Sequence, residues 1–111
     1  MANTFKNAAA AATGTALTDI YTVGSNTTTT VIGLTCANVT TTNPIKVNIK
    51  FYDASANNNF FIVKNAEIFE GGALVAVGGD QKLVLETGDK IKVSSDTAGS
   101  VDTIVSVMEQ T

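Results

Sequence analysis

The sequence predicts an all-β protein, built as a single antiparallel β-sandwich with jelly-roll-like topology and an extended N-terminal arm. Segments rich in β-branched and aromatic residues recur about every ten residues, with Gly, Asn and Asp clusters between them. From Ile45 to Tyr52, apolar residues alternate with polar or amphipathic ones, as in a strand with one buried face. No segment carries the 3.6-residue apolar repeat of an amphipathic helix, and 111 residues are enough for one domain.

We expect residues 1–14 to form the arm and residues 15–111 to form the sandwich. The alanine run from Ala8 to Ala12 is followed by Thr13-Gly14-Thr15, which interrupts any helix. The same run is too short and too weakly apolar for the core of a secretory signal. We therefore expect a chain that is made in the cytoplasm and is not secreted.

The predicted strands number about eight. They are 16–23, 28–39, 45–52, 60–63, 74–77, 82–86, 90–94 and 101–109. In the second strand Ile32, Leu34 and Cys36 share one face, so the lone cysteine is expected to fill a small core position.

Inward-facing sets are also predicted for the later strands. We expect Leu83 with Leu85, and Ile91 with Val93, to point into the core. The last strand is apolar on both faces, with Ile104 and Met108 on one face and Val101, Val105 and Val107 on the other. Such a strand is typically central in its sheet, or is covered on its second face by an arm or a neighbouring chain.

Exposed aromatic residues are the predicted contacts with partner molecules. Phe60 and Phe61 are adjacent in a strand and must point to opposite faces, so one of them lies outside the main core. With Phe5 in the arm and Tyr52 at a strand end, they are candidate intermolecular contacts. Tyr52, the loop 53–59 and one of these Phe residues could also form a sugar-binding surface.

Composition excludes several classes of function. Only 15% of residues are charged, the net charge is −3, and all basic residues are lysines. No sequence window clusters lysine with aromatic residues, so we expect no nucleic-acid binding. No span approaches the roughly 18 to 20 apolar residues needed to cross a bilayer, so we expect no membrane partner. A surface covered by Thr, Asn and Ser is comparatively easy to bury against protein partners.

The chain lacks the residues of ordinary active sites. It has no His and a single Cys, which excludes histidine-based triads and zinc clusters. We therefore expect no enzyme, no catalytic, cofactor-binding or metal residues, and no cofactor. Gly79-Asp80 and Gly88-Asp89 lack the converging oxygens of a calcium site and are interpreted as strand-to-strand turns. Asn26-Thr27-Thr28 and Asn38-Val39-Thr40 match the glycosylation pattern by chance in a chain rich in both residues.

Several stretches together resemble a known group of proteins. They are MANTFKNA, ALTDIYTV, TTTVIGL, ANVT, QKLVLETGDKIKVSS and the terminal VSVMEQT. In this order they resemble small virion structural proteins of tailed bacteriophages, prominent among phages of aquatic bacteria. The resemblance implies β-sandwich modules that serve as capsid decoration or cement proteins, or as tail or fibre parts, and it brings no catalytic or metal residues.

The expected function is therefore that of a non-enzymatic virion protein located in the phage particle. A capsid decoration or cement subunit is the leading hypothesis, with copies of itself, for example as a trimer, and the major capsid protein or other virion proteins as partners. The alternatives are a tail, fibre or head-to-tail component, and a module that binds host glycans.

Overall fold

The structure is a computed structural model that describes residues 2–41, 43–78 and 82–111. These residues form nine strands and no helix, in agreement with the predicted all-β class. The strands are β1 (Asn3–Thr13), β2 (Thr18–Thr22), β3 (Thr28–Asn38), β4 (Ile45–Asp53), β5 (Asn58–Ile68), β6 (Ala73–Val77), β7 (Leu83–Leu85), β8 (Lys90–Ser95) and β9 (Val101–Gln110). Among the described residues there is accordingly no helix long and apolar enough to cross a membrane.

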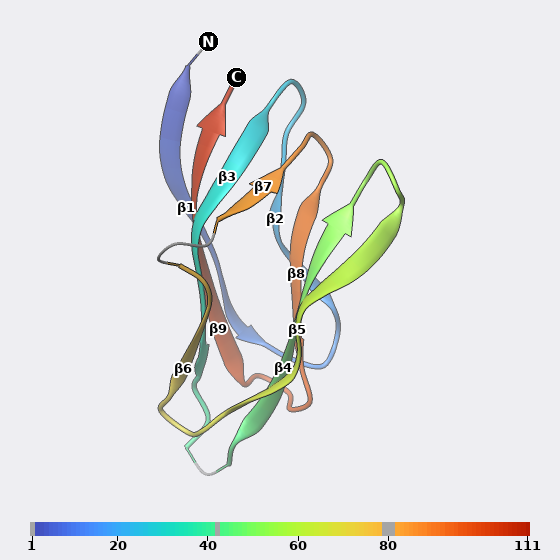
Figure 1. Ribbon diagram of the computed structural model, residues 1–111. Helices are drawn as coiled ribbons and strands as arrows, with labels where there is room; N and C mark the ends of the chain where they lie inside the picture. Colours follow the sequence, from blue (N-terminus) through green and yellow to red (C-terminus); the bar gives the residue numbers. More distant parts are fainter. Residues whose placement is uncertain (1, 42, 79–81) are drawn as a thin grey trace.

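Two antiparallel sheets pack face to face (Figure 1). One has the order β1-β9-β3-β6, and the short β7 also pairs with β3. The other has the order β2-β8-β4-β5. If β7 is set aside as a short addition, this is the strand order of a jelly roll, as predicted.

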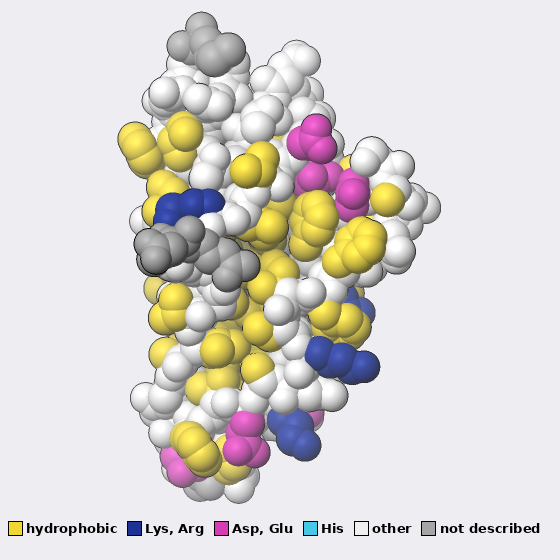
Figure 2. All heavy atoms as spheres, viewed as in Figure 1, with side chains coloured by type: hydrophobic (Ala, Val, Ile, Leu, Met, Phe, Trp, Pro, Cys, Tyr) yellow, Lys and Arg dark blue, Asp and Glu magenta, His cyan; other side chains and the backbone are white. Residues whose placement is uncertain are grey.

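The core lies between the sheets and is built from alternating positions of their strands (Figure 2). In β4 and β8 the predicted inward residues Ile45, Val47 and Ile49, and Ile91 and Val93, are fully buried. Cys36 is also fully buried, which confirms its core position.

The last strand is central, as its two apolar faces predict. β9 lies between β1 and β3 and pairs with both. Val101, Val105 and Val107 point into the core, whereas Ile104 lies on the opposite face and is 53% exposed. Nothing in the described part of the chain covers that second face.

One predicted inward set is partly wrong because β3 contains a β-bulge. The pairing of β3 with β9 shifts register between Val31 and Gly33. The extra residue reverses the side-chain alternation at this point. Val31 is therefore fully buried in place of Ile32, while Leu34 and Cys36 face the core as expected.

The predicted N-terminal arm is a strand in the structure. Residues 3–13 form strand β1, which pairs with β9 from Asn3 opposite Gln110 onwards. Ala8 and Ala10 pack against the core, and the backbone N–H of Thr111 donates to the carbonyl of Ala2 at 3.0 Å. The first fourteen residues are therefore not separate from a domain of 15–111, since β1 is an edge strand of the sandwich.

Burial predicts how two neighbouring sites respond to truncation. Leu34→Ala removes a fully buried side chain and should lower the free energy of unfolding by about 2 to 5 kcal/mol. Ile104→Ala removes a side chain that is half exposed, and should cost less than about 1 kcal/mol. Urea denaturation of both variants measures the difference. Equal losses would contradict the assignment of Ile104 to an outer face.

Candidate functional site

The outer face of the β1-β9-β3-β6 sheet, with β7, carries several large exposed apolar side chains. Antiparallel partners point to the same side of a sheet, so the strand register traces rows of neighbouring side chains across it. One row is Phe5, Met108, Thr30 and Val84, and a second, beyond the polar pair Asn7 and Ser106, is Ala9, Ile104, Thr35 and Val75. We call these two rows the apolar face.

Large side chains on the apolar face are open to solvent. Phe5 is 74% exposed, Val75 64% and Val84 59%. Between the rows, the hydroxyl of Ser106 donates to the side-chain oxygen of Asn7 at 2.8 Å. Solvent therefore meets apolar atoms across several adjacent strands.

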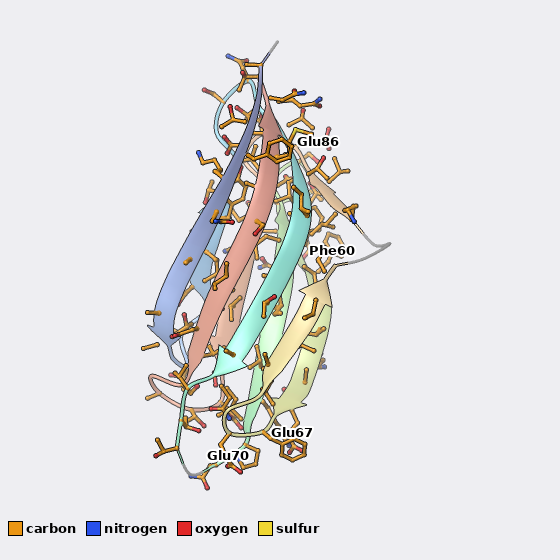
Figure 3. All side chains as sticks on the ribbon, turned by 90° about the vertical axis from the view of Figure 1, so that its left-hand side faces the viewer. Phe60, Glu67, Glu70 and Glu86 are labelled. Atoms are coloured by element: carbon orange, nitrogen blue, oxygen red, sulfur yellow. The ribbon has the colours of Figure 1, made fainter. Side chains whose placement is uncertain are left out.

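Charge is absent from the two rows of the apolar face and lies around them. Asp102 lies on the same side of the sheet, and its carboxylate accepts a hydrogen bond from the N–H of Ala12 at 2.7 Å. Figure 3 shows this sheet facing the viewer, with Glu86 near one end of the sandwich and Glu67 and Glu70 at the other. The apolar face can therefore be buried with little desolvation of charge.

The outer face of the other sheet has the opposite chemistry. Tyr52 of β4 and Phe61 of β5 each lie close to two lysines. The ammonium groups of Lys50 and Lys64 are 4.7 and 5.3 Å from the centroid of the Phe61 ring. Those of Lys92 and Lys90 are 4.9 and 5.8 Å from the centroid of the Tyr52 ring. We call these six residues the lysine–aromatic face.

The lysine–aromatic face also includes polar neighbours. The carboxylate of Asp19 in β2 lies 3.1 Å from the ammonium of Lys90 and 3.7 Å from that of Lys92. The hydroxyl of Tyr52 donates to the side-chain oxygen of Asn57 at 2.6 Å. In Figure 2 dark blue lysine side chains gather along the right-hand margin, on the side of β4 and β5.

The four predicted contact residues are thus distributed over different surfaces. Phe5 lies on the apolar face, while Tyr52 and Phe61 lie on the lysine–aromatic face. Phe60 points to the inner side of its sheet and stacks on Phe51, with 6.1 Å between ring centroids, yet it is still 47% exposed. The adjacent Phe residues therefore do point to opposite faces, and both remain accessible because β5 is an edge strand.

Sequence reasoning missed most of both faces. Val75, Val84 and Ile104 come from three strands that are distant in sequence and adjacent in the sheet. The lysines that surround Tyr52 and Phe61 come from β4, β5 and β8, so no sequence window contains them together. The signals that did point to these surfaces were the second apolar face of the last strand, Phe5 in the predicted arm, and the predicted contacts Tyr52 and Phe61.

A polar network joins the two sheets at one end of the core. The hydroxyl of Tyr21 lies 2.8 Å from the Oγ1 of Thr29 and donates to Glu109. Glu109 also accepts from the ammonium of Lys6 at 3.3 Å. Burial, reinforced by the hydrogen bond to Glu109, raises the pKa of Tyr21 to about 12. The hydrogen bond from Tyr21 lowers the pKa of Glu109, and Lys6 adds to this effect.

Gly88-Asp89 is a turn, as interpreted from the sequence. Gly88 has a φ of 87°. The Asp89 carboxylate is buried and accepts from the N–H groups of Glu86 and Ala54, each at 2.9 Å. It also lines an open pocket of about 390 Å³ with Thr28, Ser55, Glu86 and Thr87. Gly79-Asp80 lies outside the described residues.

Two further groups that could react, the Asn38 amide and the Cys36 thiol, are buried in the fold. The amide nitrogen of Asn38 is buried and donates to the carbonyls of Asn43 and Ile68 at 3.0 and 2.9 Å. This occupied nitrogen supports the view that Asn38-Val39-Thr40 is a chance match to the glycosylation pattern. Burial raises the pKa of the Cys36 thiol, which disfavours the reactive thiolate. Within the described ranges no group of three or more His, Cys, Asp or Glu residues could hold a metal ion.

No family model, curated protein or solved structure matches the chain. What the protein binds must therefore be inferred from the chemistry of its own surfaces.

The Tyr21 network predicts a loss of stability on removal of one hydroxyl. Tyr21→Phe removes the hydroxyl that bonds Thr29 and Glu109, and it should lower the free energy of unfolding by about 1 to 3 kcal/mol near neutral pH. Because folding raises the pKa of Tyr21, its stabilising contribution is present below pH 10 and is lost as the pH rises from 10 to about 12. Because folding lowers the pKa of Glu109, its contribution is present above pH 4.5 and is lost as the pH falls below that value.

Urea denaturation across this pH range checks the prediction. The difference between wild type and Tyr21→Phe should shrink at both extremes. Tyr52→Phe removes the other tyrosine hydroxyl, at a partly exposed site, and is the matched control. A difference that is independent of pH would show that the network contributes only through packing.

Proposed function

We propose that the protein is a non-enzymatic structural component of a tailed-phage virion, and specifically a capsid decoration or cement subunit. The observation that carries the proposal is the apolar face, which extends across β1, β9, β3, β6 and β7 without a charged residue in its two rows. Several large exposed apolar side chains on one face are typical of a protein–protein contact.

The size of the sheet that carries the apolar face supports an assembly role. With strands of up to about ten residues and a width of about four strands, the whole outer surface of this sheet measures roughly 30 by 20 Å, and the two rows lie within it. This area, roughly 600 Å², is somewhat below the roughly 800 Å² that each partner contributes to a stable interface of standard size. Repeated burial of such an area across neighbouring subunits would stabilise the assembled shell through binding free energy alone. No chemical step is needed.

Two further arguments support a virion component. The segments quoted above resemble small virion proteins of tailed phages. The jelly-roll order is also found in viral capsid domains, although this is an analogy of fold, and one fold can serve many functions. The same face would equally suit a tail, fibre or head-to-tail component, which remains the alternative within this class.

A charge placed on the apolar face tests the proposal. Ile104→Glu introduces a carboxylate on the central strand β9 and Val75→Glu on the edge strand β6 of the apolar face, so either should weaken association with particles at least about tenfold. Thr22→Glu places the same charge on an exposed strand of the other sheet and should leave association unchanged. Quantitative co-sedimentation with purified particles that lack the protein measures the effect, and thermal melting shows that each variant is folded.

The copy number in intact particles distinguishes the two locations. Mass-spectrometric quantification should find hundreds of copies per particle for a shell protein, but a dozen or fewer for a tail or connector. Absence of the chain from particles, or association that is unaffected by both Glu substitutions, would overturn the proposed role of the apolar face.

A further inference from the structure

We propose that the lysine–aromatic face binds an acidic carbohydrate, that is, a sugar chain bearing carboxylate or sulfate groups. The inference goes beyond the assembly role and does not depend on it, because this face lies on the opposite sheet from the apolar face. The sequence left a glycan-binding module as one alternative function, and the present inference names acidic sugar chains as the class of glycan.

The first argument is charge. Besides the four lysines next to the two rings, Lys46 also lies on this face. Side chains alternate along a strand, and Lys46 and Lys50 are four residues apart in β4, so both point to the same side. The acidic residues near these five lysines are Asp19 and Glu67 within the strands, and Asp96 directly after β8, whose carboxylate accepts from the backbone N–H of Lys46 at 3.1 Å. Positive charge therefore predominates here, although the whole chain has a net charge of −3. An anionic ligand is attracted to this face and repelled by the rest of the molecule.

The second argument is the pair of aromatic rings. Phe61 is directly opposite Lys50 in the β4–β5 pairing, and Tyr52 lies two residues further along β4. The two rings are thus diagonal neighbours across the strands, with backbones roughly 7 to 8 Å apart. The face of an aromatic ring carries partial negative charge, which favours contact with the polarised C–H groups of a sugar ring. One oligosaccharide can therefore contact the exposed parts of both rings while its anionic groups meet the lysines that lie next to them.

The third argument is the polar surroundings of the rings. Asn48 and Ser94 are paired on the same outer face, next to Lys50 and Lys92. Together with the Asp19 carboxylate they offer donors and acceptors that suit sugar hydroxyl groups. Nucleic acid fits less well, because two-point recognition of phosphate relies on arginine and the chain has none.

Binding of the full-length protein to immobilised polysaccharides tests the inference. The probes are alginate, which is carboxylated, dextran sulfate, and neutral dextran as a control. Poly-glutamate and a single-stranded thymidine oligonucleotide distinguish general anion binding and nucleic-acid binding. We expect saturable, salt-sensitive binding to alginate or dextran sulfate, which also shows whether carboxylate or sulfate is preferred, and no binding to dextran.

Matched variants then separate charge from stacking. Lys50→Gln combined with Lys92→Gln should weaken binding at least about tenfold, and Phe61→Leu or Tyr52→Leu by about fivefold or more. Lys6→Gln and Phe5→Leu make the same changes on the other sheet and should have less than about a twofold effect. Thermal melting of each variant confirms that it is folded, and the Lys→Gln exchanges at exposed sites keep the test informative if a ring variant does not fold.

Three outcomes would overturn the inference. One is no binding to either acidic polysaccharide. Another is equally tight binding to poly-glutamate with no effect of the ring substitutions, which would show a surface that responds only to charge. The third is tighter binding of the oligonucleotide than of both polysaccharides, which would favour nucleic acid. None of these results bears on association through the apolar face, so the two proposals fail independently.

Discussion

The fold depends on the insertion of the last strand into the middle of its sheet. β9 pairs with β1 along one edge and with β3 along the other, so the sheet is incomplete until residues near both ends of the chain have met. Glu109 of this strand also holds Tyr21 of the opposite sheet, and Lys6 of β1 joins the same network. These contacts join residues that are far apart in sequence, and such contacts must overcome the entropy of closing a long loop. Because Val105 of β9 faces the core, the alternation of side chains places Ile104 on the outside, and the neighbours of β9 complete the apolar face around it.

The two outer faces of the sandwich differ in the chemistry of their side chains. One sheet presents apolar side chains and the other presents lysines around two aromatic rings, while several acidic residues lie near the ends. If the apolar face docks on a particle, as proposed, the lysine–aromatic face is directed away from it. An assembly contact and a ligand surface can then act at the same time, because neither covers the other.

Most of the fold could be predicted from local patterns, and most of the surfaces could not. Alternation in β4 and β8 correctly gave Ile45, Val47, Ile91 and Val93 as inward residues, since burial of one face imposes a two-residue period. The bulge at Ile32 interrupts this period in β3, and the adjacent Gly33 is the local signal of a bulge that the strand alternation alone does not take into account. β1 was missed as a strand because an alanine-rich segment shows little contrast between its faces. The lysine–aromatic face depends on which strands become neighbours, and strand order is not encoded in any single window of sequence.

The hydrogen bond between Ala2 and Thr111 brings the two ends of the chain together at one end of the sandwich (Figure 1). Because these two ends are neighbours, the order of the strands in space does not require the chain to start at β1, and a circular permutant is possible. A short linker across this gap would let the chain begin instead at the exposed β4–β5 loop, with every strand keeping its neighbours. It also means that a segment attached to either terminus would leave the molecule at the same point, beside the edge formed by β1 and clear of the lysine–aromatic face.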